Sequence, residues 1–127
     1  GDPYACIDAP RDAAKLMLLV ALNASSRKGA LLAYHKECGE RGGDVYDTIV
    51  SAHPVISEYI GSDIGVKLQR MDSDIALDVC MHFAKKGVAC IPIHDSFIVK
   101  KKHTTELAGV MIDAYSKRTG GYTCPIK

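Results

Sequence analysis

The sequence has little that suits a membrane-embedded or disulfide-stabilised protein. Its longest uncharged apolar run, Leu16 to Ala24, is far shorter than the ~20 residues that a bilayer-spanning helix needs. Its five cysteines are scattered and form no CxxC pair, which favours reduced thiols in a cytosolic protein over a disulfide framework. We therefore expect a cytoplasmic location and no membrane partner.

An excess of charge of either sign is also missing. The chain carries 16 Lys and Arg against 15 Asp and Glu, a net charge of +1, whereas a domain that binds nucleic acid unaided is usually clearly basic. Apolar residues make up 47% and charged residues 24% of the 127 residues, which excludes a disordered tail or a fibre. We expect a single domain over residues 1–127 and, since the chain does not open with Met, a fragment of a longer protein.

Apolar residues at helical spacing dominate the chain, and they predict an α+β fold that is mostly helical with one β-hairpin. Four helices are expected over Arg11–Asn23, Lys28–Cys38, Asp44–Val50 and Asp63–Lys86. A last helix is marked by Leu107, Val110, Met111, Ala114 and Tyr115. In the first helix, the residues expected on one buried face are Leu16, Leu19, Val20 and Asn23.

The hairpin is predicted late in the chain. Two short apolar runs, Val88–Ile93 and Phe97–Val99, read as strands, and His94-Asp95-Ser96 between them has the composition of a turn. The three lysines Lys100, Lys101 and Lys102 follow as a basic loop that ends at His103. The ordinary interpretation of these lysines is a solvated loop, and the functional alternative is that they contact nucleic-acid phosphate.

Two features could bind a ligand: the Asp95 carboxylate and the pair of cations Arg11 and Lys15. The Asp95 carboxylate is expected at the tip of the hairpin, either as an ordinary turn residue or as a ligand. Arg11 and Lys15 lie four apart on one helical face; their long side chains either reach solvent or bind an anion such as a triphosphate.

The order of these features resembles that of single-subunit, phage-type RNA polymerases and family A DNA polymerases. Arg11-x3-Lys15, followed by Asn23-Ala24, resembles motif B of the fingers helix, in which Tyr-Gly stands where this chain has Asn-Ala. His94-Asp95-Ser96-Phe97 resembles motif C, and Gln69 to Ser73 lies on the intervening helix. The fold expected is thus the fingers and palm portion of a right-hand polymerase.

The resemblance implies a template-directed nucleotidyltransferase that uses Mg²⁺, nucleoside triphosphates and a nucleic-acid template and primer. Two-ion phosphoryl transfer needs acidic ligands on a rigid support. Asp95 would be a catalytic metal ligand and His94 would position the primer or product end. Arg11 and Lys15 would hold the triphosphate, and Asn23, at the position of the motif's Tyr, would be a further nucleotide-binding residue.

The remaining nucleic-acid contacts would come from Gln69, Lys100, Lys101 and Lys102. Motif A, which supplies the other catalytic Asp, is expected upstream of this chain, so the chain alone should be inactive. Two alternatives stay open: a non-catalytic nucleic-acid-binding module of the same ancestry, or a helical protein-interaction domain.

Overall fold

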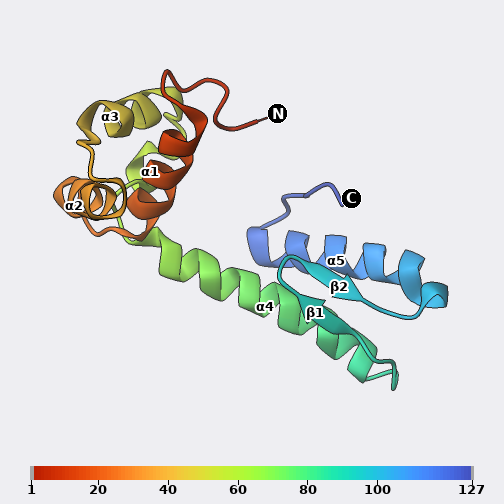
Figure 1. The fold of residues 1–127 in the computed structure, drawn as a ribbon. Helices are drawn as coiled ribbons and strands as arrows, with labels where there is room; N and C mark the ends of the chain where they lie inside the picture. The colour runs from red at the N-terminus through yellow and green to blue at the C-terminus, as the bar shows by residue number, and fades with distance from the viewer. Residues whose placement is uncertain (1, 127) are drawn as a thin grey trace. The chain divides into compact units, whose positions relative to one another are not determined.

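The chain forms two compact units in the computed structural model, which describes residues 2–126. The N-terminal unit comprises residues 1–68 and the C-terminal unit residues 69–127. Both are helical except for one short antiparallel hairpin in the C-terminal unit (Figure 1). The mostly helical fold with one hairpin is therefore confirmed. Among the described residues, no helix has both the length and the apolar composition needed to cross a membrane.

Local sequence signals set the helix limits of the N-terminal unit. Its helices are α1 (Arg11–Asn23), α2 (Arg27–Cys38), α3 (Gly43–Ala52), the 3₁₀ turn η1 (Ser57–Tyr59) and the first residues of α4 (Ile64–Ala84). The Ser26 hydroxyl caps α2 by accepting from the Gly29 amide at 3.1 Å, as Ser commonly does at a helix start. Gly39 ends α2 with a φ of 75°, a left-handed conformation that glycine adopts without strain.

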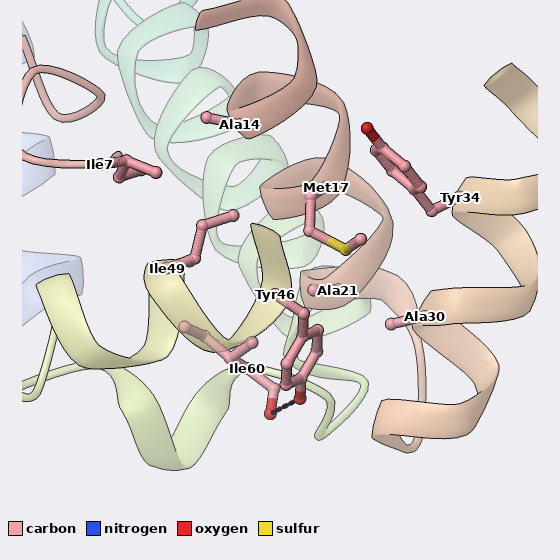
Figure 2. Close-up of a cluster of buried hydrophobic side chains, with 9 residues drawn as sticks. All are labelled: Ile7, Ala14, Met17, Ala21, Ala30, Tyr34, Tyr46, Ile49 and Ile60. Atoms are coloured by element: carbon pink, nitrogen blue, oxygen red, sulfur yellow. Dashed lines mark hydrogen bonds between the residues drawn. The ribbon is translucent and has the colours of Figure 1, made fainter. Parts of the chain in front are cut away.

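The core of the N-terminal unit lies where α1 packs against α2 and α3 (Figure 2). Its fully buried residues include Ala14, Met17 and Ala21 on α1, so small side chains let the helices approach closely. The expected buried face of α1 was partly wrong, because Leu19 is 60% exposed and Asn23 is exposed as well. Helical spacing identified an apolar helix, but the packing of α2 and α3 selected the face.

Tyrosines close the two ends of this core. Tyr34 is buried on α2, and the hydroxyl of the buried Tyr46 donates a hydrogen bond of 3.4 Å to the carbonyl oxygen of Ile60 (Figure 2). A buried hydroxyl without a partner would be costly. The bond therefore fixes the segment that precedes α4 against α3.

The C-terminal unit is built from most of α4, the strands β1 (Ile91–Ile93) and β2 (Ser96–Ile98), the 3₁₀ turn η2 (Lys101–His103) and α5 (Thr104–Thr119). Its small core contains Val79 and Phe83 from α4 with Leu107 and Ala114 from α5. Phe97 packs against this core from β2. The strands are shorter than expected, and Ser96 is the first residue of β2 rather than part of the turn.

Two further details concern the basic stretch after the hairpin and the exposed apolar residues of α4. The basic stretch is not an extended loop, because Lys101–His103 form η2 and lead directly into α5. On α4, Leu68 and Met71 fall at helical spacing but are 47% and 36% exposed. At the same spacing, Val79 is fully buried and Ile75 is half-buried.

Candidate functional site

The turn that carries Asp95 is a two-residue connection. Ile93 pairs with Ser96, which leaves only His94 and Asp95 between the strands. His94 has a positive φ of 54°, and Asp95 is not among the positive-φ residues, the combination found in type II′ hairpin turns. Glycine usually occupies that first position, so a histidine there costs on the order of 1 kcal/mol. The strained residue, His94, is one of the residues that resemble motif C.

Asp95 itself is exposed and lightly engaged. The Ser96 hydroxyl donates to its Oδ1 at 3.3 Å, and no ion pair within residues 2–126 involves its carboxylate. Two carboxylate oxygens have about four lone-pair sites for hydrogen bonds or metal coordination. Most of that capacity is therefore open to a ligand.

Asp95 borders a cavity of about 660 Å³ in the C-terminal unit. Its walls come from the hairpin turn, from α4, from α5 and from the segment after α5. Asp72 lines the same cavity, as does Tyr115. In the sequence, Asp72 belongs to an acidic stripe that is more often only a helix surface, and it stands apart from Asp74 and Asp78 because it lies in the segment Gln69 to Ser73 that resembles the polymerases. The structure brings His94, Asp95 and Asp72 to one concave surface.

The described residues do not form the two-ion site that the resemblance implies. No group of three or more His, Cys, Asp or Glu side chains within residues 2–126 is arranged to hold a metal ion. Asp95 with Asp72 supplies two carboxylates on one cavity. Mg²⁺ is commonly bound through one or two carboxylates with water and substrate phosphates, but two ions need a larger acidic set. The described residues alone therefore do not support two-ion phosphoryl transfer.

The candidate nucleotide-binding residues lie along the exposed side of α1, in the N-terminal unit. Arg11, Lys15 and Asn23 are all exposed; Lys15 follows Arg11 by four residues, and Asn23 follows Lys15 by eight. Arg11 donates from Nε to Asp2 at 3.2 Å, and its guanidinium lies 5.1 Å from the ring centre of Tyr4. Lys15 has no ion-pair partner among residues 2–126. An incoming anion would thus meet one free cation and one shared with Asp2.

Two neighbouring hydrogen-bond donors lower the pKa of Asp2. The backbone N–H of Tyr4 donates to its carboxylate at 3.0 Å, and this bond, with the Arg11 guanidinium second, lowers the pKa of Asp2 below its usual 3.8. Asp2 is therefore ionised at neutral pH and competes with any anion for Arg11.

Asn23 has mainly local contacts. Its side-chain amide donates to the carbonyl oxygen of Leu19, one turn back, at 2.8 Å. Its Oδ1 lies only 2.1 Å from the place that a Cβ at Gly65 would occupy, so Gly65 lets α4 begin against the end of α1. These contacts anchor Asn23 where the resembling motif has Tyr.

The four residues expected to contact nucleic acid are exposed in the C-terminal unit. Gln69 lies on α4, Lys100 precedes η2, and Lys101 and Lys102 begin it. None of the three lysines takes part in an ion pair within residues 2–126. Their ammonium groups are free to meet phosphate.

A charged cluster that the sequence did not reveal lies beside these lysines. Glu106 on α5 accepts hydrogen bonds from Lys86, from His82 Nε2 at 3.0 Å and from His103 Nδ1 at 3.3 Å. Lys86 first, and then the two imidazoles, lower the pKa of Glu106 from its usual 4.5 to about 2. The cluster joins the end of α4 to η2 and the first turn of α5. The contacts of Glu106 with His82 and Lys86 span 24 and 20 residues, so they leave no local sequence pattern.

Two half-buried thiols also meet in this unit. Cys80 on α4 donates weakly to the carbonyl oxygen of Cys90 at 3.9 Å. Burial first, and the neighbouring Cys80 thiol second, raise the pKa of Cys90 above its usual 9.0. At neutral pH Cys90 is thus a protonated, weakly reactive thiol.

No family model, no curated protein and no solved structure matches the chain. The resemblance to polymerases therefore rests on the residues of the three motifs and on their order. The structure assigns these residues to separate units: the motif B residues to α1 of the N-terminal unit, and the motif C residues to the hairpin of the C-terminal unit.

Proposed function

We propose that the chain is the fingers and palm portion of a template-directed nucleotidyltransferase. The observation that supports this most is the lightly engaged Asp95 carboxylate, carried on a strained two-residue turn at the edge of a cavity. Turn strain is kept in a fold where the surroundings or a function require it. A carboxylate presented on a rigid hairpin is what metal-assisted phosphoryl transfer uses.

The hairpin also presents one uncovered apolar face. Ile91, Ile93 and Ile98 are 55%, 46% and 53% exposed, whereas Phe97 packs into the core. Alternate residues of a strand point to opposite faces, so these isoleucines form a face without a partner among the described residues. A palm sheet with a further strand carrying the second catalytic Asp would cover it.

In this proposal, Arg11 and Lys15 bind the triphosphate and offset the charge that develops on it. Asp95 would hold a metal ion together with a second catalytic carboxylate that the described residues do not supply, and the ion would stabilise charge on the transferring phosphoryl group. His94 positions the primer or product end. Gln69 and the lysines from Lys100 to Lys102 contact the nucleic acid.

A triphosphate titration tests the role of α1. We expect Arg11→Ala and Lys15→Ala each to weaken binding of a Mg²⁺–nucleoside triphosphate by roughly three- to tenfold, because each removes a charge-assisted contact. Asp2→Asn should strengthen it, since Arg11 loses its competitor. Lys36→Ala, an exposed lysine on α2, is the matched control and should bind like the parent. If Arg11→Ala also binds like the parent, the motif B assignment is withdrawn.

A primer-extension assay tests the division of the catalytic residues. The 127-residue chain should not extend a primer with Mg²⁺ or Mn²⁺, because its described carboxylates do not form a two-ion site. Extension that is lost in Asp95→Asn and in Asp72→Asn would instead place both ligands on this chain.

The free lysines at η2 favour one second candidate, a nucleic-acid-binding module without catalysis. That module would keep duplex binding in Asp95→Asn and lose it in Lys101→Ala, with no response to triphosphate. Binding that falls steeply with added salt would identify phosphate contacts as its main source.

A further inference from the structure

The N-terminal unit contains a second cavity that the motif residues do not line. Its volume is about 710 Å³, within the range of small-molecule sites. One wall is a face of α2 formed by Arg27, Lys28, Leu31, Leu32 and His35, and the other is the segment Arg41 to Asp44 that leads into α3.

Positive charge outweighs negative charge around this cavity. Its permanent cations are Arg27, Lys28 and Arg41, and its one carboxylate is Asp44. Lys28 and Arg41 are exposed and have no ion-pair partner among residues 2–126. Two unpaired cations at the rim of one concave surface attract an anion with more than a single charge.

Arg27 is held in place at the same rim. Its Nη2 donates to Asp47 Oδ2 at 3.0 Å and its Nε to Oδ1 at 3.3 Å. Its guanidinium also lies 5.4 Å from the ring centre of Tyr46. A guanidinium fixed by a fork of hydrogen bonds and by an aromatic face loses little conformational entropy when it meets a ligand.

The floor of the cavity comes close to the core. A Cβ at Gly42 would lie 2.2 Å from Cε of Met17 and 2.7 Å from Cδ1 of Tyr34. Only glycine fits there, and it seats the start of α3 against α1 and α2. The first turn of α3 has no side-chain cap, and its residues Gly43 and Asp44 line the cavity, so the positive end of the helix dipole also favours an anion there.

Part of the α2 wall is apolar. Leu31 is half-buried and Leu32 is 62% exposed on α2. Inorganic phosphate would use the cations and leave the leucines uncovered. A phosphate ester with an apolar body would cover both parts of the surface.

We propose that this cavity binds a small phosphate ester of the nucleotide class, with its phosphate on Lys28 and Arg41 and its base or sugar against Leu31 and Leu32. The site is separate from the triphosphate site proposed on α1 and does not depend on it. It gives the N-terminal unit a second place for a nucleotide.

The probe is adenosine 5′-monophosphate, titrated into the isotope-labelled chain while backbone amide NMR shifts are followed. We expect the shifts to centre on the amides of Leu31, Leu32, Gly43 and Asp44. Arg41→Ala and Lys28→Ala should each weaken binding about five- to tenfold, in line with the loss of a charge-assisted hydrogen bond. Both residues are exposed, so neither variant threatens the fold.

The controls separate this proposal from the one on α1. Arg11→Ala and Lys36→Ala should leave the shifts at Gly43 and Asp44 unchanged, and Arg41→Ala should leave the Arg11-dependent binding of triphosphate unchanged. Adenosine and inorganic phosphate should each bind at least tenfold more weakly than the monophosphate, because each lacks half of the contacts.

Three results would overturn the proposal. One is an Arg41→Ala variant that binds the monophosphate like the parent chain. The second is adenosine that binds as well as the monophosphate, which would assign the cavity to an uncharged ligand. The third is a short single-stranded oligonucleotide that binds far more tightly at the same amides, which would assign these cations to a nucleic-acid strand.

Discussion

The two units bury their apolar residues in different ways. In the N-terminal unit, three helices surround a core of small alanines and larger side chains such as Tyr34 and Met17, and nine of the described residues from Ile7 to Ile60 are buried in one cluster. In the C-terminal unit, four residues of the described range 69–126 are buried, and the hairpin leaves three isoleucines exposed. A small core leaves more of the stability to charged contacts such as those of Glu106 and Arg118. The difference indicates that the stability of the C-terminal unit depends more on contacts outside its apolar core than that of the N-terminal unit does.

The largest expected effect comes from the core of the C-terminal unit. Phe83→Ala should cost about 3–5 kcal/mol, because Phe83 is fully buried and packs edge-on near His82 and His103. Hydrogen exchange should show loss of protection in α5 and the hairpin while α1 to α3 stay protected. Met17→Ala is the matched variant in the other unit and should leave α5 protected. Uniform loss of protection in both units would show that the comparison is false.

Removing turn strain should have a smaller effect of the opposite sign. His94→Gly should stabilise the C-terminal unit by about 1 kcal/mol, since glycine adopts a positive φ without a Cβ clash. Urea unfolding followed with a probe in α5 would measure it, with Ser96→Gly as a control that removes no positive-φ side chain. A destabilised His94→Gly variant would show that His94 makes contacts worth more than the strain.

Acid should weaken the C-terminal unit through Glu106. Its folded pKa of about 2 lies below the usual 4.5, so the stabilisation is complete above about pH 4.5 and is lost as the pH falls toward 2. Thermal unfolding between pH 6 and pH 2, roughly the window set by linkage, should show this loss in the parent and a smaller loss in Glu106→Gln. An identical pH profile for both chains would remove Glu106 as the cause.

The smallest expected effect is a difference in coupling energy between one ion pair of each unit. Arg118 donates to Asp78 from Nε at 2.7 Å and from Nη2 at 2.8 Å, and this bond lowers the pKa of Asp78 below its usual 3.8. The pair links α4 to α5, whereas the more exposed pair of Arg27 and Asp47 links α2 to α3. Double-mutant cycles should give a measurable coupling for the first pair and little for the second. The reverse order would contradict the view that the smaller core relies more on charge.

Much of the local structure could be predicted from the sequence. The expected helices match those observed to within a few residues, and the two-stranded hairpin lies where the two short apolar runs and the turn composition between them predicted it. The position of Asp95 at the turn followed from the same local signals. Helix limits and tight turns depend on neighbouring residues such as Pro10, Ser26 and Gly39, which is why a single sequence carries them.

The surroundings of each candidate residue could not be predicted in this way. The buried face of α1 depends on which helices pack against it, so Leu19 was misplaced. The cavity beside Asp95 joins residues from Asp72 to Ile126. The Glu106 cluster joins helices that lie 20 or more residues apart.

The sequence by itself determined the order of the motifs, the balance of charge and the limits of the helices, because these depend on residue identity and short-range geometry. Only the tertiary structure decided that Asp72 shares a cavity with Asp95 and that Lys28 and Arg41 border a second cavity. It also decided that the hairpin isoleucines stay uncovered. Burial and concavity depend on contacts between distant segments, and those contacts exist only once the chain has packed.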